Sequence, residues 1–109
     1  DDVYTDLFTF IRNNIQEGYG IIYCHKKAEC DELSERVAQS TGLHTRAYHA
    51  GLKASERHEV QKEWTSGVAK VVVATVAFGM GIDKADVRFV VHMTLPKSME
   101  SYYQETGRA

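Results

Sequence analysis

The alternation of short apolar runs with helically patterned stretches limits the possible folds of this chain more than any other feature. The apolar runs occupy residues 20–24, 71–74 and 89–91, and the more polar stretch 44–48 is predicted as a further strand. Turn-forming residues bound them, and their length is that of buried strands. Between and before them, apolar side chains recur every three or four residues, which predicts helices. Strands that alternate with helices predict an α/β fold, a three-layer parallel sheet with helices on both faces.

Glycines mark the ends of the predicted helices, where they commonly adopt the left-handed conformation. The first three helices are expected to end near Gly18, Gly42 and Gly67. After Pro96, Ser98 can cap a short last helix that runs through Glu105. In a sheet of this kind, ligands meet the carboxyl ends of the strands. We therefore expect functional residues in the segments that follow residues 24, 48, 74 and 91.

Length and charge limit the class of protein. The 109 residues suit one domain, and no apolar run approaches the ~20 residues of a membrane helix. The net charge is -2, so contact with nucleic acid must come from a few placed groups rather than from a basic field. The acidic start resembles no signal peptide and lacks Met, so we expect the chain to begin within a longer protein. Cys24 and Cys30 match neither a disulfide framework nor a zinc pattern, and we expect buried thiols in a reducing compartment.

The sequence lacks the usual residues for holding ATP and magnesium by itself. No glycine is followed by lysine, so there is no phosphate loop of the Walker type. The acidic pair Asp31-Glu32 falls inside a predicted helix rather than at a strand end. An ATPase function therefore needs a partner domain that supplies these groups.

The first candidate site follows the first predicted strand, at residues 23–30. Lys26 and Lys27 lie where a helix begins, and helix N–H groups beside two ammonium groups favour the binding of a phosphate. The alternative is that the two lysines only solvate the helix start. A phosphatase-like nucleophile at Cys24 is rejected, because the arginine that such a loop needs six positions later is Cys30 here. The intervening residues also lack glycine.

The second candidate site follows the second predicted strand, at residues 48–53. Small residues such as Gly51 let a ligand approach the backbone closely. His49 could donate a hydrogen bond to a phosphate. The alternative is a loop histidine whose hydrogen bonds are satisfied within the protein.

The third candidate site lies within residues 74–83, where a buried strand opens into a loop with two glycines and Asp83. The Asp83 carboxylate can accept a hydrogen bond from a hydroxyl, such as that of a ribose. A Rossmann fingerprint would need glycine at the position of Lys84, which argues against a dinucleotide site. The alternative is a structural turn in which Asp83 caps the backbone.

The fourth candidate site, residues 102–109, places Gln104 and Arg108 close together in sequence. An exposed arginine at the rim of a sheet can stabilise phosphoryl charge that another domain supplies. The alternative is a plain charge near a helix C-terminus. Tyr102 and Tyr103 suit packing better than base stacking.

In their order and spacing, these four stretches resemble motifs IV, IVa, V and VI of superfamily 2 helicases, and their residues are most similar to the RecQ family. The matching segments are 20–24, 48–52, 73–84, 86–92 and 101–109. The resemblance covers nearly the whole chain apart from the first predicted helix. The motif V and motif VI stretches are the most specific.

The resemblance implies that residues 1–109 are a helicase C-terminal domain, the second of two RecA-like lobes, and a fragment of a longer chain. The family unwinds DNA from 3′ to 5′ with ATP hydrolysis and serves replication, recombination and repair. ATP and Mg²⁺ are expected to be held mainly by the first lobe, in a cleft between the lobes. The expected partners are single-stranded and duplex DNA and that first lobe, with no membrane. The expected location is the nucleus of a eukaryote, or otherwise the cytoplasm.

The resemblance also assigns roles to individual residues. Those expected to contact the backbone of the single strand are Lys26, Lys27, His49, Gly51 and Thr75. Those expected at the nucleotide are Gly81, Asp83, Gln104 and Arg108, the last two in catalysis. The family's arginine finger is a second arginine three positions after Arg108, beyond Ala109, so Arg108 is expected to support it. Family members commonly have Ser or Arg where this chain has Lys26 and Lys27.

Two alternatives stay open: an RNA helicase lobe of the same architecture, and a non-catalytic nucleic-acid-binding scaffold. Competition between DNA and RNA single strands separates the first alternative from a DNA helicase. DNA-stimulated turnover after the first lobe is restored separates the second. The fragment alone is expected to be inactive.

Overall fold

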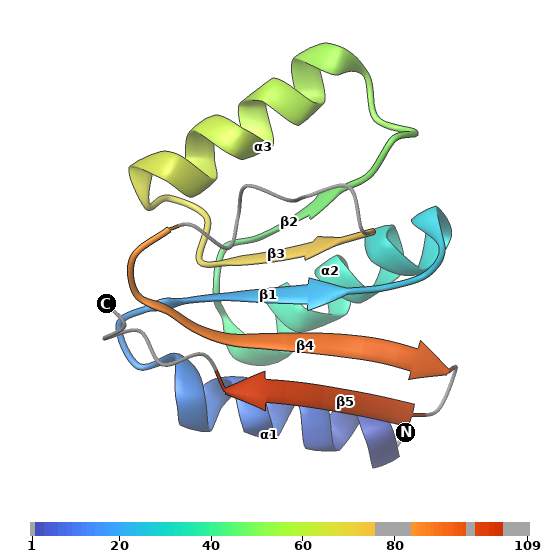
Figure 1. Ribbon diagram of the computed structural model, residues 1–109, viewed down its shortest axis with the longest axis vertical. Coiled ribbons are helices and arrows are strands. Elements are labelled where there is room, and N and C mark those ends of the chain that lie inside the picture. Colours follow the sequence, from blue (N-terminus) through green and yellow to red (C-terminus); the bar gives the residue numbers. More distant parts are fainter. Residues whose placement is uncertain (1, 76–83, 96–97, 104–109) are drawn as a thin grey trace.

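The strands form one mostly parallel sheet. The computed structural model describes the backbone of residues 2–75, 84–95 and 98–103, and the side chains of residues 4–75 and 84–93. Within these residues the elements are α1 (Asp2–Ile15), β1 (Tyr19–Tyr23), α2 (Lys27–Thr41), β2 (Thr45–Tyr48), α3 (Ala54–Ser66), β3 (Val71–Ala74), β4 (Val87–Leu95) and β5 (Ser98–Tyr103). The strand order is β2-β3-β1-β4-β5 (Figure 1). The pairs β2–β3, β3–β1 and β1–β4 are parallel, which confirms the predicted parallel sheet.

Helices cover both faces of this sheet. Successive residues of a strand point to opposite faces, so both faces carry apolar side chains that the helices bury. On the face covered by α1 and α2, the buried cluster includes Leu7, Ile11, Ile22, Leu33, Val37, Val73 and Phe89. On the face covered by α3, the buried cluster includes Ile21, Val60, Trp64, Val72 and Val90. Neighbouring residues of one strand, such as Ile21 and Ile22, therefore belong to different cores. The predicted three-layer arrangement is confirmed.

A close side-chain approach requires the glycine in the central strand. Gly20 of β1 is the register partner of Phe89 in β4. A Cβ at position 20 would fall 2.1 Å from Cζ of Phe89. The Phe89 side chain is fully buried and packs edge-on against Phe10, with 5.4 Å between ring centroids. Its ring has little room to move aside in so dense a core.

The predicted helix ends and the predicted state of the cysteines are confirmed. Gly42 caps α2 and Gly67 caps α3 at the C-terminal end, with φ values of 76° and 91° that glycine adopts without strain. Cys24 and Cys30 are both free and buried. None of the described helices is long and apolar enough to cross a membrane.

The predicted last helix is wrong. The segment that begins at Ser98 forms β5, which runs antiparallel to β4 with Val91 opposite Ser101. The helix prediction rested on a local capping pattern. However, β4 is nine residues long and without β5 would be an open edge with unpaired backbone groups. Pairing with a further strand satisfies those groups, and adjacent tyrosines favour extended structure.

Candidate nucleic-acid interface

Three of the segments predicted to carry function lie side by side at one edge of the sheet. β1, β2 and β3 are parallel, so their carboxyl ends meet at the same edge (Figure 1). Backbone hydrogen bonds join the segments. The Cys24 N–H donates to the Ala74 carbonyl at 2.8 Å, and the Thr75 N–H donates to the Tyr48 carbonyl at 3.3 Å. The residues that follow these strands are therefore held together, where ligands of parallel sheets are bound.

Two exposed lysines lie at the start of α2. Lys26 is the N-cap residue, with extended backbone angles and no side-chain hydrogen bond that caps the helix. The positive end of the helix dipole therefore lies beside the ammonium groups of Lys26 and Lys27. Glu29 contributes one negative charge to the same turn. Asp31, one turn further along the helix, is directed to His49. Two cations and the helix N-terminus therefore outweigh the carboxylate of the first turn, so the group suits a phosphate.

Hydrogen bonds of His49 organise the loop that follows β2. The His49 side chain is buried, and its Nε2 lies 2.9 Å from Oδ1 of Asp31 in α2. The Gly51 N–H donates to its Nδ1 at 3.1 Å. The Leu52 N–H donates to the His49 carbonyl at 3.1 Å, which closes a turn. The loop is thereby tied to the helix that carries the two lysines.

The first turn of α3 holds the same loop from its other end. The Arg57 guanidinium donates from Nη1 to the Leu52 carbonyl at 2.6 Å. The Lys53 N–H donates to the Glu56 carboxylate at 3.0 Å, which satisfies a backbone donor at the helix start. Contacts with α2 and with α3 together give the loop a defined geometry.

The side chain of Lys27 lies close to the backbone of Gly51. A Cβ at position 51 would lie 3.2 Å from Cδ of Lys27 and 3.1 Å from Nδ1 of His49. Glycine leaves the room that this approach needs. The structure therefore brings together Lys27 from the first candidate site and His49 and Gly51 from the second, to which the family resemblance gave a common role. Lys26 immediately precedes Lys27 as the N-cap of α2. The Thr75 N–H is bonded to Tyr48, the last residue of the strand that leads into the loop.

The residues predicted at the nucleotide are Gly81, Asp83, Gln104 and Arg108. All lie outside the described residues, and their roles stay predictions. Lys84, which follows Asp83 in the sequence, is described. Its ammonium lies 4.3 Å from the Tyr19 ring centroid and donates to the Thr65 carbonyl at 3.3 Å. These contacts tie the last residue of the motif V stretch to the end of α3 and the start of β1.

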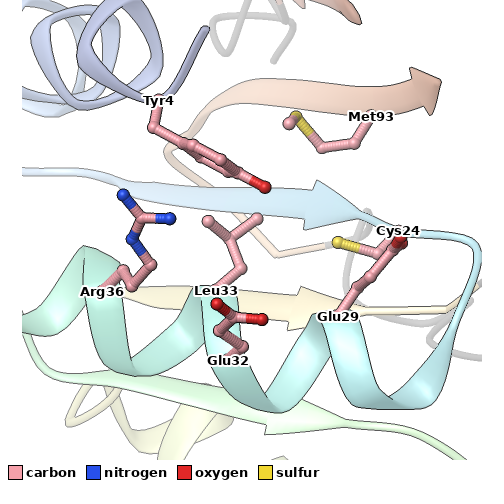
Figure 2. A pocket seen from close by; sticks show the side chains of 7 residues that line it. All are labelled: Tyr4, Cys24, Glu29, Glu32, Leu33, Arg36 and Met93. Atoms are coloured by element: carbon pink, nitrogen blue, oxygen red, sulfur yellow. The ribbon is translucent and has the colours of Figure 1, made fainter. Parts of the chain in front are cut away.

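A small cavity lies beside α1 and α2, apart from the loop after β2. Figure 2 shows the Tyr4 ring and the Arg36 guanidinium at one end of it and Cys24 at the other. Arg36 lies 4.1 Å from the Tyr4 ring centroid. The cavity volume of about 30 Å³ is far below the ~300 Å³ of a typical ligand pocket, so the cavity is too small for a nucleotide. A hydrogen bond with Cys30 and burial raise the pKa of the Cys24 thiol, which agrees with the rejection of a cysteine nucleophile.

Sequence analysis does not single out Asp31 or Arg57 as functional residues. Asp31 follows Lys27 by one helical turn, so spacing along the helix was the available signal. Arg57 stands in the same relation to Lys53. Their partners do not follow from spacing, because the contact with His49 joins two different elements of the fold.

Comparison with known proteins finds relatives along the whole chain. The family of helicase conserved C-terminal domains matches residues 2–109. The chain is 52% identical over 108 residues to the ATP-dependent DNA helicase hus2/rqh1 of Schizosaccharomyces pombe, covering 99% of this chain and 8% of that protein. It is 53% identical over 90 residues to the ATP-dependent DNA helicase RecQ of Pasteurella multocida, covering 83% of this chain and 14% of that protein. The chain thus spans only a small part of each relative.

Solved structures of similar fold are found as well. A variant of Saccharomyces cerevisiae Dbp5 bound to Gle1 and IP6 matches with a TM-score of 0.71 and 26% identity, over 87% of this chain and 24% of that chain. The helicase Lhr of Mycobacterium smegmatis, bound to single-stranded DNA and AMP-PNP, matches with a TM-score of 0.68 and 24% identity, over 84% of this chain and 12% of that chain. These likenesses confirm the predicted fold class.

Proposed function

The chain belongs to the family of helicase conserved C-terminal domains, and from this membership we propose that it is the second motor lobe of an ATP-dependent 3′ to 5′ DNA helicase. The identity to curated helicases confirms the resemblance to the RecQ family that the motifs predicted. The lobe holds the backbone of a single strand and completes an ATP site that the first lobe of the same protein mainly forms. Replication, recombination and repair of DNA are the processes that this activity serves, in the nucleus of a eukaryote or otherwise in the cytoplasm.

The observation that carries the strand contact is the grouping of cationic and backbone groups at the carboxyl edge of the sheet. Lys26, Lys27 and the start of α2 lie beside the loop at Gly51. Ammonium groups and helix N–H groups bind phosphate oxygens without reading bases. Since the net charge of the chain is -2, a local group of this kind accounts for binding better than a general basic surface does. A motor that steps along DNA of any sequence needs such backbone contacts.

The nucleotide side of the proposal rests on the family motifs. Gly81 and Asp83 face the nucleotide, while Gln104 and Arg108 lie at its phosphates. Phosphoryl transfer needs positioned positive charge more than covalent help, and Arg108 supplies part of that charge beside an arginine finger beyond Ala109. ATP and Mg²⁺ are held mainly by the first lobe. Because the site is completed only when the lobes approach, hydrolysis and lobe movement are coupled.

Single-strand binding across a range of salt concentrations tests the proposed strand contact. The protein used is the longer chain with both lobes, and its affinity for a labelled single strand is measured by fluorescence anisotropy. The double variant Lys26→Ala/Lys27→Ala should bind more weakly. The slope of log affinity against log salt should also fall by about 0.7 for each phosphate that a lysine no longer neutralises. Competition with unlabelled RNA then separates a DNA helicase from an RNA helicase.

The matched control removes a positive charge elsewhere. Lys62 is exposed on α3 and has no part in the proposed strand contact. The variant Lys62→Ala should leave both the affinity and the salt slope at their wild-type values. Equal losses in the control and in the double variant would mean that general charge, not this site, attracts the strand.

A further inference from the structure

The hydrogen bonds of the His49 ring fix its tautomer. The Gly51 N–H donates to Nδ1, so Nδ1 acts as the acceptor and carries no proton. The proton of the neutral ring is then on Nε2, which donates to Oδ1 of Asp31 at 2.9 Å. Both ring nitrogens are thus committed to partners within the fold, one on α2 and one in the loop after β2.

Burial keeps this ring away from a ligand. His49 is 4% exposed, whereas the Asp31 side chain is 60% exposed. Gly51 is also exposed, and so is Lys27. The exposed groups at this edge are therefore the Lys27 ammonium, which can pair with a phosphate, and the Gly51 backbone, whose N–H is already bonded to His49. A phosphate could bond to a ring nitrogen of His49 only by displacing Gly51 or Asp31.

The ring does, however, determine where Gly51 lies. It bonds to the Gly51 amide on one side and to α2 on the other. The Lys27 stem packs against the same glycine, 3.2 Å from the position of a Cβ. A change in the His49 ring therefore moves the Gly51 backbone against which Lys27 packs, although Gly51 and Lys27 themselves are unchanged.

We infer that His49 is a positioning residue of the strand interface: joined to Asp31, it orients the Gly51 backbone beside Lys27 and does not itself contact the strand. This inference rests on the proposed function and deepens it. Exposed groups such as the Lys27 ammonium contact the phosphate, and the buried His49 ring determines where those groups lie.

Two variants of His49 separate positioning from direct contact. In His49→Asn, the side-chain oxygen can still accept from the N–H two residues later, as in an Asx turn, although the link to Asp31 is lost. In His49→Ala, both bonds are lost. In the two-lobe protein, His49→Ala should weaken single-strand binding about 10-fold, as expected for the loss of one or two hydrogen bonds. His49→Asn should stay within about 2-fold of wild type, because it keeps the bond to the Gly51 N–H.

The salt slope separates positioning from direct contact with a phosphate, and strand affinity together with amide exchange at Gly51 separates positioning from a role in the fold alone. The slope should stay at its wild-type value in both His49 variants, whereas Lys27→Ala should reduce it by about 0.7. Hydrogen exchange of the peptide that contains Gly51 should accelerate in His49→Ala and stay near wild type in His49→Asn. His44→Ala is the matched control, because His44 also pairs with a carboxylate, Glu63 at 2.9 Å, but precedes β2 rather than following it. That variant should bind the strand normally.

Two results overturn the inference. If His49→Asn binds as weakly as His49→Ala and both lower the salt slope, the ring contacts a phosphate directly. If His49→Ala lowers only the melting temperature, with affinity and Gly51 exchange unchanged, the ring serves the fold alone. Failure of the proposed function looks different, because the wild-type protein would then not bind the strand or Lys27→Ala would have no effect.

Discussion

Replacing Gly20 with alanine tests the packing on which the central strand depends. The new Cβ would meet three atoms of the Phe89 ring, the nearest at 2.1 Å. β1 cannot retreat, because it is paired with β3 on one side and with β4 on the other. The ring cannot retreat easily either, because it is fully buried and packs against Phe10. The substitution therefore overpacks the core that α1 and α2 cover.

The expected cost follows from two opposing effects. Overpacking a dense core costs about 1–3 kcal/mol. Replacing glycine lowers the entropy of the unfolded chain, which contributes about 0.4–1 kcal/mol in the opposite direction. We expect Gly20→Ala to lower the free energy of unfolding by about 1–2 kcal/mol, measured by urea denaturation. With a typical urea slope, the unfolding midpoint falls by roughly 1 M or slightly less.

A double-mutant cycle assigns this cost to the ring. Phe89→Leu makes room at position 20, so the combined change should cost less than the sum of the two single changes. Gly42→Ala is the control: among the described residues no atom of another element lies within 4 Å of its Cβ, and its φ of 76° alone strains alanine. The cost of Gly42→Ala should add to that of Phe89→Leu. Unchanged stability in Gly20→Ala, or strict additivity with Phe89→Leu, would refute the packing argument.

Further predictions concern titratable groups. Burial alone would raise the pKa of Glu63, but hydrogen bonds from His44 and Arg46 outweigh it and lower the pKa. The Glu63 carboxylate therefore stabilises the fold at neutral pH, and this contribution is lost as the pH falls and the group is protonated. Glu63→Gln should lower the free energy of unfolding by about 0.5–1 kcal/mol near neutral pH and leave it unchanged in acid, as measured by urea denaturation. A loss of stability that does not depend on pH would contradict this. Cys24 and Cys30 should resist a bulky thiol reagent until urea unfolds the chain, because both are buried and the pKa of Cys24 is raised by its bond with Cys30 and by burial. Labelling of the folded chain at the unfolded rate would contradict it.

Most of the architecture follows from local sequence. The apolar run at residues 71–74 predicts a buried strand because helices cover both faces of a parallel sheet, so that every side chain of such a strand is buried. Gly42 and Gly67 end their helices because only glycine enters the left-handed region without strain. β5 does not follow from local sequence. Its stability comes from pairing with β4, whereas the residues around Ser98 carry a helix-capping signal.

The same division holds at the site. Lys26, Lys27 and Gly51 could be placed at one edge because parallel strands present their carboxyl ends together. The role of the His49 ring could not be deduced in this way. Its partner Asp31 lies on another element, and only the packed structure brings the two side chains within 2.9 Å.

The most direct test of the account is single-strand-stimulated ATPase activity of the two-lobe protein, compared with its Asp83→Ala and Arg108→Ala variants. If this chain is the second motor lobe, single-stranded DNA stimulates turnover. Each variant should then reduce the stimulated rate by about 10-fold or more, which corresponds to about 1.4 kcal/mol of barrier. If DNA leaves the wild-type rate unchanged, the motor-lobe account is contradicted. If DNA stimulates turnover equally in wild type and both variants, the family assignment stands and the proposed nucleotide site is wrong.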